Sequence, residues 1–75
     1  MTVVADLEVG VRARVLSVNG SDEIAMRLLE MGVTPGVELW IVGCAPLGDP
    51  LELELRGYRL SVRRNEAERI EVTQQ

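Results

Sequence analysis

The side chains that carry most enzyme chemistry are scarce in this sequence. It contains no histidine, so the most common general base is absent. Its single cysteine, Cys44, has no histidine to activate it, and a buried structural thiol is the favoured interpretation. No glycine-rich phosphate-binding motif occurs. We therefore predict no catalytic residue and no bound cofactor.

Potential metal ligands are equally sparse. One cysteine without histidine cannot build a closed zinc or ferrous site. The carboxylates of Asp49, Glu52 and Glu54 could hold a metal weakly at the surface, but a solvated strand face is the favoured interpretation. We predict no metal site.

Charge is distributed unevenly along the chain. The net charge is −4 and all eight basic residues are arginine, which argues against general nucleic-acid affinity. Residues 55–65 nevertheless contain four arginines and no acid: Arg56, Arg59, Arg63 and Arg64. These arginines either pair with acids across a hairpin, as Glu54 and Arg59 are expected to do, or bind an anionic surface. The first interpretation is favoured, although Arg63 and Arg64 have no predicted partner.

Several apolar side chains have no obvious place in so small a core. Met26 lies on the flank of a predicted helix, Leu29 widens the apolar face of that helix, and Leu47 lies at a predicted loop tip. Trp40 lies on the wet face of a predicted strand; covering the helix or a loop is the favoured role, and a partner contact is the alternative. Leftover apolar surface indicates an interaction site. The candidate partner-binding residues are Met26, Leu29, Trp40, Leu47, Arg63 and Arg64.

A short helix is predicted between Ser21 and Gly32. Ser21 suits the N-cap, because its hydroxyl can accept a hydrogen bond from the first turn. Gly32 suits the position after the helix, which favours a positive φ. Apolar residues recur at the spacing of one helix face: Ile24, Leu28 and Met31. Pro35 and Gly36 then predict a type II turn into a strand.

Alternating apolar and polar residues predict short strands on both sides of this helix. The predicted strands cover residues 11–18, 37–45 and 70–72, together with a hairpin over 51–62. Leu16 and Val18 break the alternation late in the first strand, which indicates a bulge or burial of both strand faces beneath the helix. Leu7 and Val9 are expected to be buried beneath the sheet. Asn65 and Glu68 are expected to cap one helical turn over residues 64–69.

The hairpin has the best-defined register. A two-residue turn at Arg56-Gly57 pairs three apolar couples on one face: Leu55 with Tyr58, Leu53 with Leu60, and Leu51 with Val62. The same register sets Glu54 opposite Arg59.

Length and pattern together predict a single domain over residues 1–75, with an ordered core of about 5–72 and a frayed tail over 73–75. The fold class is mainly β, a small, partly open antiparallel barrel with one short helix inserted after the first strand. No secretory leader is visible, and no apolar run approaches the ~20 residues that span a bilayer. A cytosolic location is the default expectation.

Three stretches resemble a known family. They read LLEMGVTPG over residues 28–36, APLGDP over 45–50 and RGYRLSVR over 56–63. In this order they resemble the FeoA family, small cytosolic proteins of bacterial ferrous-iron uptake, and the resemblance runs from about Ala5 to Val72. It implies an SH3-like β-barrel with a helical insertion.

The resemblance also implies a partner, the membrane iron permease FeoB, which carries a cytosolic GTP-binding region. We therefore predict a non-enzymatic accessory protein, cytoplasmic and peripheral to the inner membrane through its partner, which binds and regulates FeoB. Related domains occur in iron- and manganese-dependent repressors, so a regulatory module of that type is an alternative. A small nucleic-acid-binding barrel is another, which the acidic charge disfavours. Both a monomer and a weak dimer are compatible with the sequence.

Overall fold

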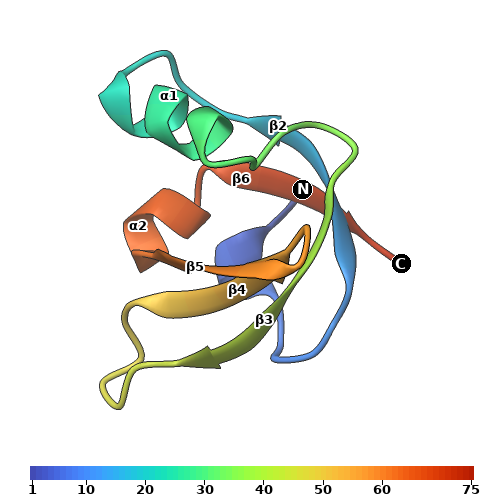
Figure 1. Cartoon of the computed structure of the whole chain (residues 1–75), viewed down its shortest axis with the longest axis vertical. Coiled ribbons are helices and arrows are strands. Elements are labelled where there is room, and N and C mark those ends of the chain that lie inside the picture. The colour runs from blue at the N-terminus through green and yellow to red at the C-terminus, as the bar shows by residue number, and fades with distance from the viewer.

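Six strands form one antiparallel sheet in the order β1-β6-β2-β3-β4-β5 (Figure 1). The computed structural model describes all 75 residues. The strands are β1 (Thr2–Val3), β2 (Ala13–Val18), β3 (Glu38–Cys44), β4 (Leu51–Leu55), β5 (Tyr58–Val62) and β6 (Ile70–Gln74). The helices are the 3-10 turn η1 (Val4–Asp6), α1 (Glu23–Glu30) and α2 (Arg64–Ala67). Since β1 and β5 end the order, the sheet is not closed, and the predicted mainly-β, partly open arrangement is confirmed.

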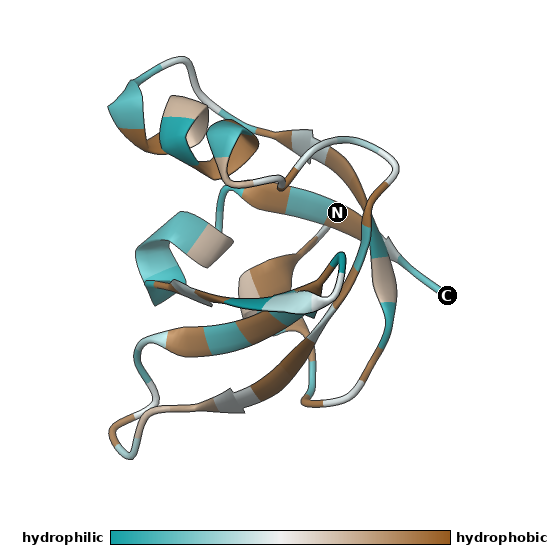
Figure 2. Ribbon diagram, in the orientation of Figure 1, coloured by the Kyte–Doolittle hydropathy of each residue, from teal (hydrophilic) through white to brown (hydrophobic).

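The hairpin between β4 and β5 has the predicted register. Leu51 pairs with Val62, Leu53 with Leu60 and Leu55 with Tyr58, and Arg59 forms an ion pair with Glu54 at 3.5 Å. Arg56 and Gly57 both have positive φ in the turn. Figure 2 shows hydrophobic and hydrophilic bands alternating along β4, whose three leucines are buried. The register of the β4–β5 hairpin could therefore be predicted from the local alternation of apolar and polar residues.

The predicted irregularity in the first long strand is a bulge. The pairing of β2 with β6 shifts register between Val15 and Ser17, which leaves Leu16 out of the ladder. Leu16 is half exposed, so the alternative of burial on both faces is wrong. A second register shift lies in β3 between Ile41 and Gly43.

The predicted start of α1 is wrong by one residue, whereas its predicted end is confirmed. The N-cap is Asp22, not Ser21, because the Asp22 carboxylate accepts the Ala25 N–H at 3.2 Å. At the other end Gly32, at φ +102°, and Val33 donate to the carbonyls of Leu29 and Leu28. This pair of bonds is a Schellman motif, which needs the positive φ that glycine adopts without strain.

The loop after α1 contains the predicted turn. The Val37 N–H donates to the Thr34 carbonyl at 3.1 Å, and Gly36 has φ +93°. Positive φ at the third position is the mark of a type II turn. The Gly36 N–H also donates to the Val15 carbonyl, which joins the turn to β2.

Three other details that the sequence predicted are wrong: the cap of α2, the burial of Val9 and the frayed C-terminal tail. Arg63, not Asn65, is the N-cap of α2, and the acid that reaches back to it is Glu66, not Glu68. Val9 is mostly exposed, whereas Leu7 is buried as expected. The C-terminal residues are not a frayed tail: β6 runs to Gln74, and its last residues pair with β2.

The interior is aliphatic, since no aromatic side chain belongs to the buried cluster. One cluster of buried side chains joins η1, α1, α2 and the strands. Leu28 is the buried residue that attaches the middle of α1 to this cluster. No helix in the structure is both long and apolar enough to cross a bilayer.

Candidate functional site

Three polar contacts hold α1 against the segment from β5 to β6. At its start, Arg69 donates to the Asp22 carboxylate. In its middle, Arg27 pairs with Glu66. At its end, the Tyr58 hydroxyl donates to the Met31 carbonyl. The helix is therefore positioned along its whole length by residues that follow it by 27 to 47 positions.

The contact between Arg69 and Asp22 at the start of α1 lowers the pKa of the Asp22 carboxyl group. The hydrogen bond from Arg69, and then that from the Ala25 N–H, hold the pKa of Asp22 below its ordinary value of 3.8. Both bonds favour the charged carboxylate, which also sits at the positive end of the helix dipole.

Glu66 is the one buried charged residue, and both of its carboxylate oxygens are used. Its Oε1 accepts the backbone N–H of Arg63 at 2.9 Å, and its Oε2 accepts from Arg27. The Glu66 side chain is only 9% exposed, so these bonds replace the water that it loses. Glu66 thereby joins α1, α2 and the end of β5.

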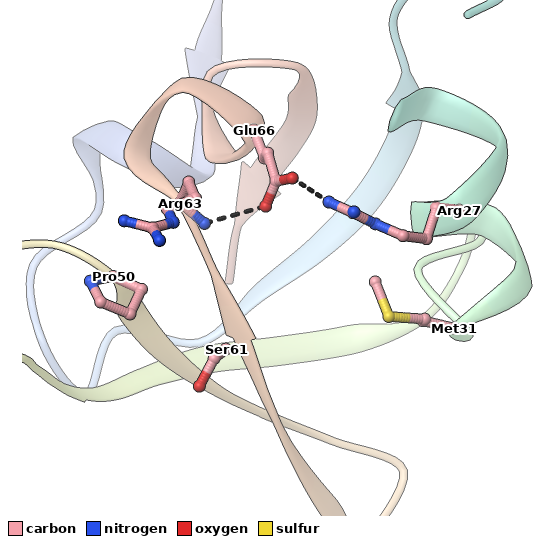
Figure 3. Close-up of a pocket in the computed structure, with 6 residues that line it drawn as sticks. All are labelled: Arg27, Met31, Pro50, Ser61, Arg63 and Glu66. Atoms are coloured by element: carbon pink, nitrogen blue, oxygen red, sulfur yellow. Dashed lines mark hydrogen bonds and ion pairs between the residues drawn. The ribbon is translucent and has the colours of Figure 1, made fainter. Parts of the chain in front are cut away.

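A pocket of about 520 Å³ opens beside this carboxylate. Figure 3 shows Arg27 of α1 and the C-cap residue Met31 on one side, Arg63 and Pro50 on the other, and Ser61 of β5 below. The lining residues are Arg27, Met31, Pro50, Ser61, Arg63 and Glu66. Four of the six lining residues are polar or charged, and two of these are arginines.

The four clustered arginines have different environments. Arg59 pairs with Glu54, and Arg56 donates to the Thr34 hydroxyl at 3.3 Å. Arg64 donates through Nε to the Gly48 carbonyl at 2.6 Å. The guanidinium of Arg63 has no hydrogen bond or ion pair; Arg63 lines the pocket, and in Figure 3 its guanidinium lies on the Pro50 side, turned away from Glu66. The expected pairing with an acid across the hairpin is thus confirmed for Arg59 alone. The Arg56 and Arg64 side chains bond to neutral oxygens, and Arg63 is left without a partner.

The loop between β3 and β4, residues 45–50, is held in place by Arg64. Besides the bond to Gly48, the Arg64 backbone N–H donates to Asp49 Oδ1 at 3.1 Å. Inside the loop, the Gly48 N–H donates to the Ala45 carbonyl at 2.7 Å, and the Asp49-Pro50 peptide is cis. Leu47 at the tip is 98% exposed, so this ordered loop presents an apolar side chain to solvent.

Met26 and Leu29 give α1 a partly exposed apolar flank. Their side chains are 58% and 40% exposed. A residue advances about 100° around an α-helix, so Leu29 lies about 200° from Arg27 and faces away from the pocket. In Figure 1, α1 and the β3–β4 loop occupy opposite ends of the molecule, whose longest extent is 30 Å. Leu47 is therefore not adjacent to Met26 and Leu29.

Trp40 belongs to another cluster. The Arg12 guanidinium lies over its ring, 4.1 Å from the ring centroid, and also pairs with Glu38 at 2.9 Å. Trp40 is half-buried. One face of the indole is thus occupied by a cation–π contact within the chain.

The remaining residues with reactive or metal-binding groups lie apart. Cys44 is exposed at the end of β3, so the expectation of a buried thiol is wrong. Glu52 accepts from the Ser61 hydroxyl, Glu54 pairs with Arg59, and Asp49 accepts from Arg64. No three residues of the metal-binding types His, Cys, Asp and Glu lie together.

Of the six sequence-predicted binding residues, only Arg63 lines the pocket. Arg64 is next to Arg63 in sequence but holds the loop, Met26 and Leu29 lie at one end and Leu47 at the other, and Trp40 packs against Arg12. Arg27 and Glu66 are central to the site and were missed. Glu66 lies three residues after Arg63, where the acid of a capping box belongs, but an arginine side chain cannot accept the reciprocal bond, so the pattern did not indicate this cap. No local sequence pattern links Arg63 or Glu66 to Arg27.

The chain matches known proteins over nearly its whole length. Residues 2–74 match the family model described as the FeoA domain. A relative from Porphyromonas gingivalis, described as an Fe(2+) transport protein A/Fe(2+) transporter FeoB fusion protein, is 38% identical over 68 residues. These residues are 91% of this chain but 8% of the relative, so this chain spans a small part of that protein.

Two solved structures are similar in sequence and fold. FeoA protein from Chlorobium tepidum is 41% identical, with a TM-score of 0.86 over 95% of this chain and 68% of that one. FeoA from Stenotrophomonas maltophilia, solved with zinc and described as a procaryotic SH3 domain protein, is 32% identical. Its TM-score is 0.86 over 97% of this chain and 91% of that one. The expected SH3-like fold is thereby confirmed.

Proposed function

Because this chain belongs to the FeoA family of ferrous-iron transport accessory domains, we propose that it binds and regulates a FeoB-type permease through the permease's cytosolic GTP-binding region. In this proposal it is a non-enzymatic cytoplasmic protein that is peripheral to the membrane through its partner. The observation that carries the proposal is the Porphyromonas gingivalis relative, in which a domain like this one and a FeoB transporter share one polypeptide.

Fusion of a FeoA-like domain to a FeoB transporter favours contact between the two, because it raises the local concentration of each near the other. Two modules on one chain meet at an effective concentration of roughly millimolar, so weak contacts suffice there. A separate chain must supply that affinity through its own surface. Exposed apolar anchors and an unpaired arginine are the residue types expected to do so.

One partner can reach both apolar ends of the molecule. A standard interface buries about 800 Å² on each partner, an area roughly 30 Å across. That width matches the longest extent of the chain, 30 Å. We propose that the partner contacts Met26 at one end, with Leu29 at the edge of that contact, and Leu47 at the other end, with Arg63 between them. Trp40 and Arg64 belong to the proposed surface as supporting residues, since each already has a partner within the chain.

Binding of substituted chains to the isolated GTP-binding region tests this proposal. Leu29→Asp and Leu47→Asp each place a charge in the proposed interface, and each should weaken binding by about tenfold or more, or 1.4 kcal/mol. Val9→Asp is the matched control, because Val9 is 62% exposed and outside the proposed surface. Its affinity should stay within about twofold.

Circular dichroism checks that each variant is folded. Met26→Asp repeats the test at a more exposed site of α1 if Leu29→Asp unfolds the helix. Unchanged binding in the Leu47 variant and in the folded α1 variant would remove this surface from the proposal. Failure of the unsubstituted chain to bind would overturn the proposal itself.

A further inference from the structure

We propose that the pocket between α1, β5 and α2 binds one carboxylate of an acidic peptide segment, and that the Arg63 guanidinium holds it. The inference rests on the proposed function in one respect: the segment would belong to the docking partner. The pocket itself is defined by this chain alone.

The charge in the pocket is matched to a single negative group. Arg27, Arg63 and Glu66 are the charged lining residues, so the lining carries a formal charge of +1. Glu66 has already used both oxygens, on Arg27 and on the Arg63 backbone. The free donors in the pocket therefore belong to guanidinium groups, and chiefly to Arg63, which has no acceptor in the structure.

A carboxylate fits these donors better than a phosphate does. One planar guanidinium offers two parallel N–H groups to the two oxygens of a carboxylate. A phosphate monoester carries about −1.5 to −2 charges at pH 7, more than the lining can neutralise. The chain as a whole is also negative, at −4, which disfavours a dianion further.

The size and walls of the pocket indicate a peptide rather than a free small acid. Its volume of about 520 Å³ lies well above that of one carboxylate and within the range of ligand pockets, about 300–1,000 Å³. Met31 and Pro50 supply apolar wall on opposite sides (Figure 3). The methylene groups of a glutamate and an adjacent apolar residue can lie against these walls while the carboxylate meets Arg63.

The position of Arg63 is fixed before any ligand arrives. Its backbone N–H donates to Glu66, and Glu66 is held in turn by Arg27 from the facing helix. Its carbonyl accepts the N–H groups of Glu66 and Ala67. Binding therefore orders only the Arg63 side chain, which limits the entropic cost. In this account Arg27 and Glu66 are positioning residues, and Arg63 makes the contact.

Nuclear magnetic resonance titration of the full chain tests the pocket. The probe is the blocked peptide acetyl-Gly-Leu-Glu-Leu-Gly-amide, and its glutamine isostere is the uncharged control. We expect saturable amide shifts at Ser61, Arg63 and Glu66 with the glutamate peptide, and at least about tenfold weaker binding of the glutamine peptide. Equal binding of both peptides, or no saturable shift up to the solubility of the glutamate peptide, would overturn the inference.

Two arginine variants and one anion complete the test. Arg63→Gln should weaken the binding of the glutamate peptide by at least about tenfold. Arg59→Gln, a change of the same kind at a 72% exposed side chain outside the pocket, should leave binding within about twofold. Equal binding to the Arg63 variant would contradict the assignment. Inorganic phosphate that binds the same amides more tightly than the peptide would overturn the choice of a carboxylate.

The peptide experiment and the permease experiment can fail separately. If the GTP-binding region binds the unsubstituted chain and Arg63→Gln equally, the proposed function stands and the pocket assignment is wrong. If the peptide occupies the pocket but the GTP-binding region does not bind, the pocket stands and the proposed partner is wrong.

Discussion

Two adjacent arginines show how strongly local geometry separates residues of one type. The Arg64 side chain turns to the β3–β4 loop and fixes Gly48 and Asp49, while the Arg63 guanidinium is left without an acceptor beside a pocket. A sequence pattern gives both residues the same charge and nearly the same position. Only the direction of each side chain distinguishes a residue that supports a loop from one that is available to a ligand.

Gly32 carries a conformational and a steric requirement at once. Its φ is +102°, and a Cβ built there would overlap the Tyr58 hydroxyl. Gly32→Ala should therefore lower the free energy of unfolding by about 1–3 kcal/mol, as expected for a strained backbone position. Urea denaturation measures this loss. Gly43→Ala is the control, because a Cβ at Gly43 meets nothing within 4 Å, and it should change stability by less than about 0.5 kcal/mol.

Asp22 should make the stability of α1 depend on acid pH. Its pKa is lowered in the folded chain, so the unfolded chain binds more protons once the pH falls toward 3.8. The stabilisation is complete above that pH and is lost as the pH falls through the lower folded-state pKa. Asp22→Asn keeps a capping side chain without the charge, and its stability deficit at pH 7 should shrink at pH values near the folded-state pKa. A deficit that stays constant from neutral to acid pH, measured by urea denaturation, would contradict this.

At the scale of elements, α1 is a short helix that its surroundings hold. At eight residues it would be marginal in isolation, and its buried residues Ala25 and Leu28 face the core. Asp22, Arg27 and the Met31 carbonyl then bond to three positions on the segment from the start of β5 to the start of β6. Displacement of α1 would therefore break the pocket wall that Arg27 and Met31 form.

Leu28→Ala tests how far packing, rather than helix propensity, holds α1. Leu28 is fully buried, so its truncation should cost about 2–5 kcal/mol in the free energy of unfolding. Met26→Ala, on the same helix but 58% exposed, should cost less than about 1 kcal/mol. Denaturant titration gives both values. Similar losses at the two positions would show that intrinsic helix stability, and not the core contact, determines the effect.

The same elements show which parts of the fold the sequence could predict. The β4–β5 hairpin depends on residues less than 12 positions apart, and its register followed from alternation around the turn at Arg56-Gly57. The helix start at Asp22 was missed, because Ser21 and Asp22 are both good caps and Arg69, 47 positions later, bonds to Asp22. The Arg27–Glu66 pair could not be predicted either, because its two residues lie 39 positions apart in the sequence. Long-range polar contacts leave no periodic signal.

At the scale of the whole molecule, an acidic chain presents a small cationic pocket between two apolar ends. The net charge of −4 keeps nonspecific anions away, while the pocket lining is locally positive. Apolar contacts at Leu47 and at the α1 flank would supply affinity, and the pocket would select an acidic group. Such a division of roles is consistent with an accessory domain whose proposed activity is binding.

The most direct test of this account is isothermal titration of the full chain into the isolated cytosolic GTP-binding region of the FeoB-type permease from the same genome, at low and high salt. We expect saturable one-to-one binding that weakens as salt screens the contact at Arg63. An absence of binding heat at both salt concentrations, together with no complex in analytical ultracentrifugation, would contradict it.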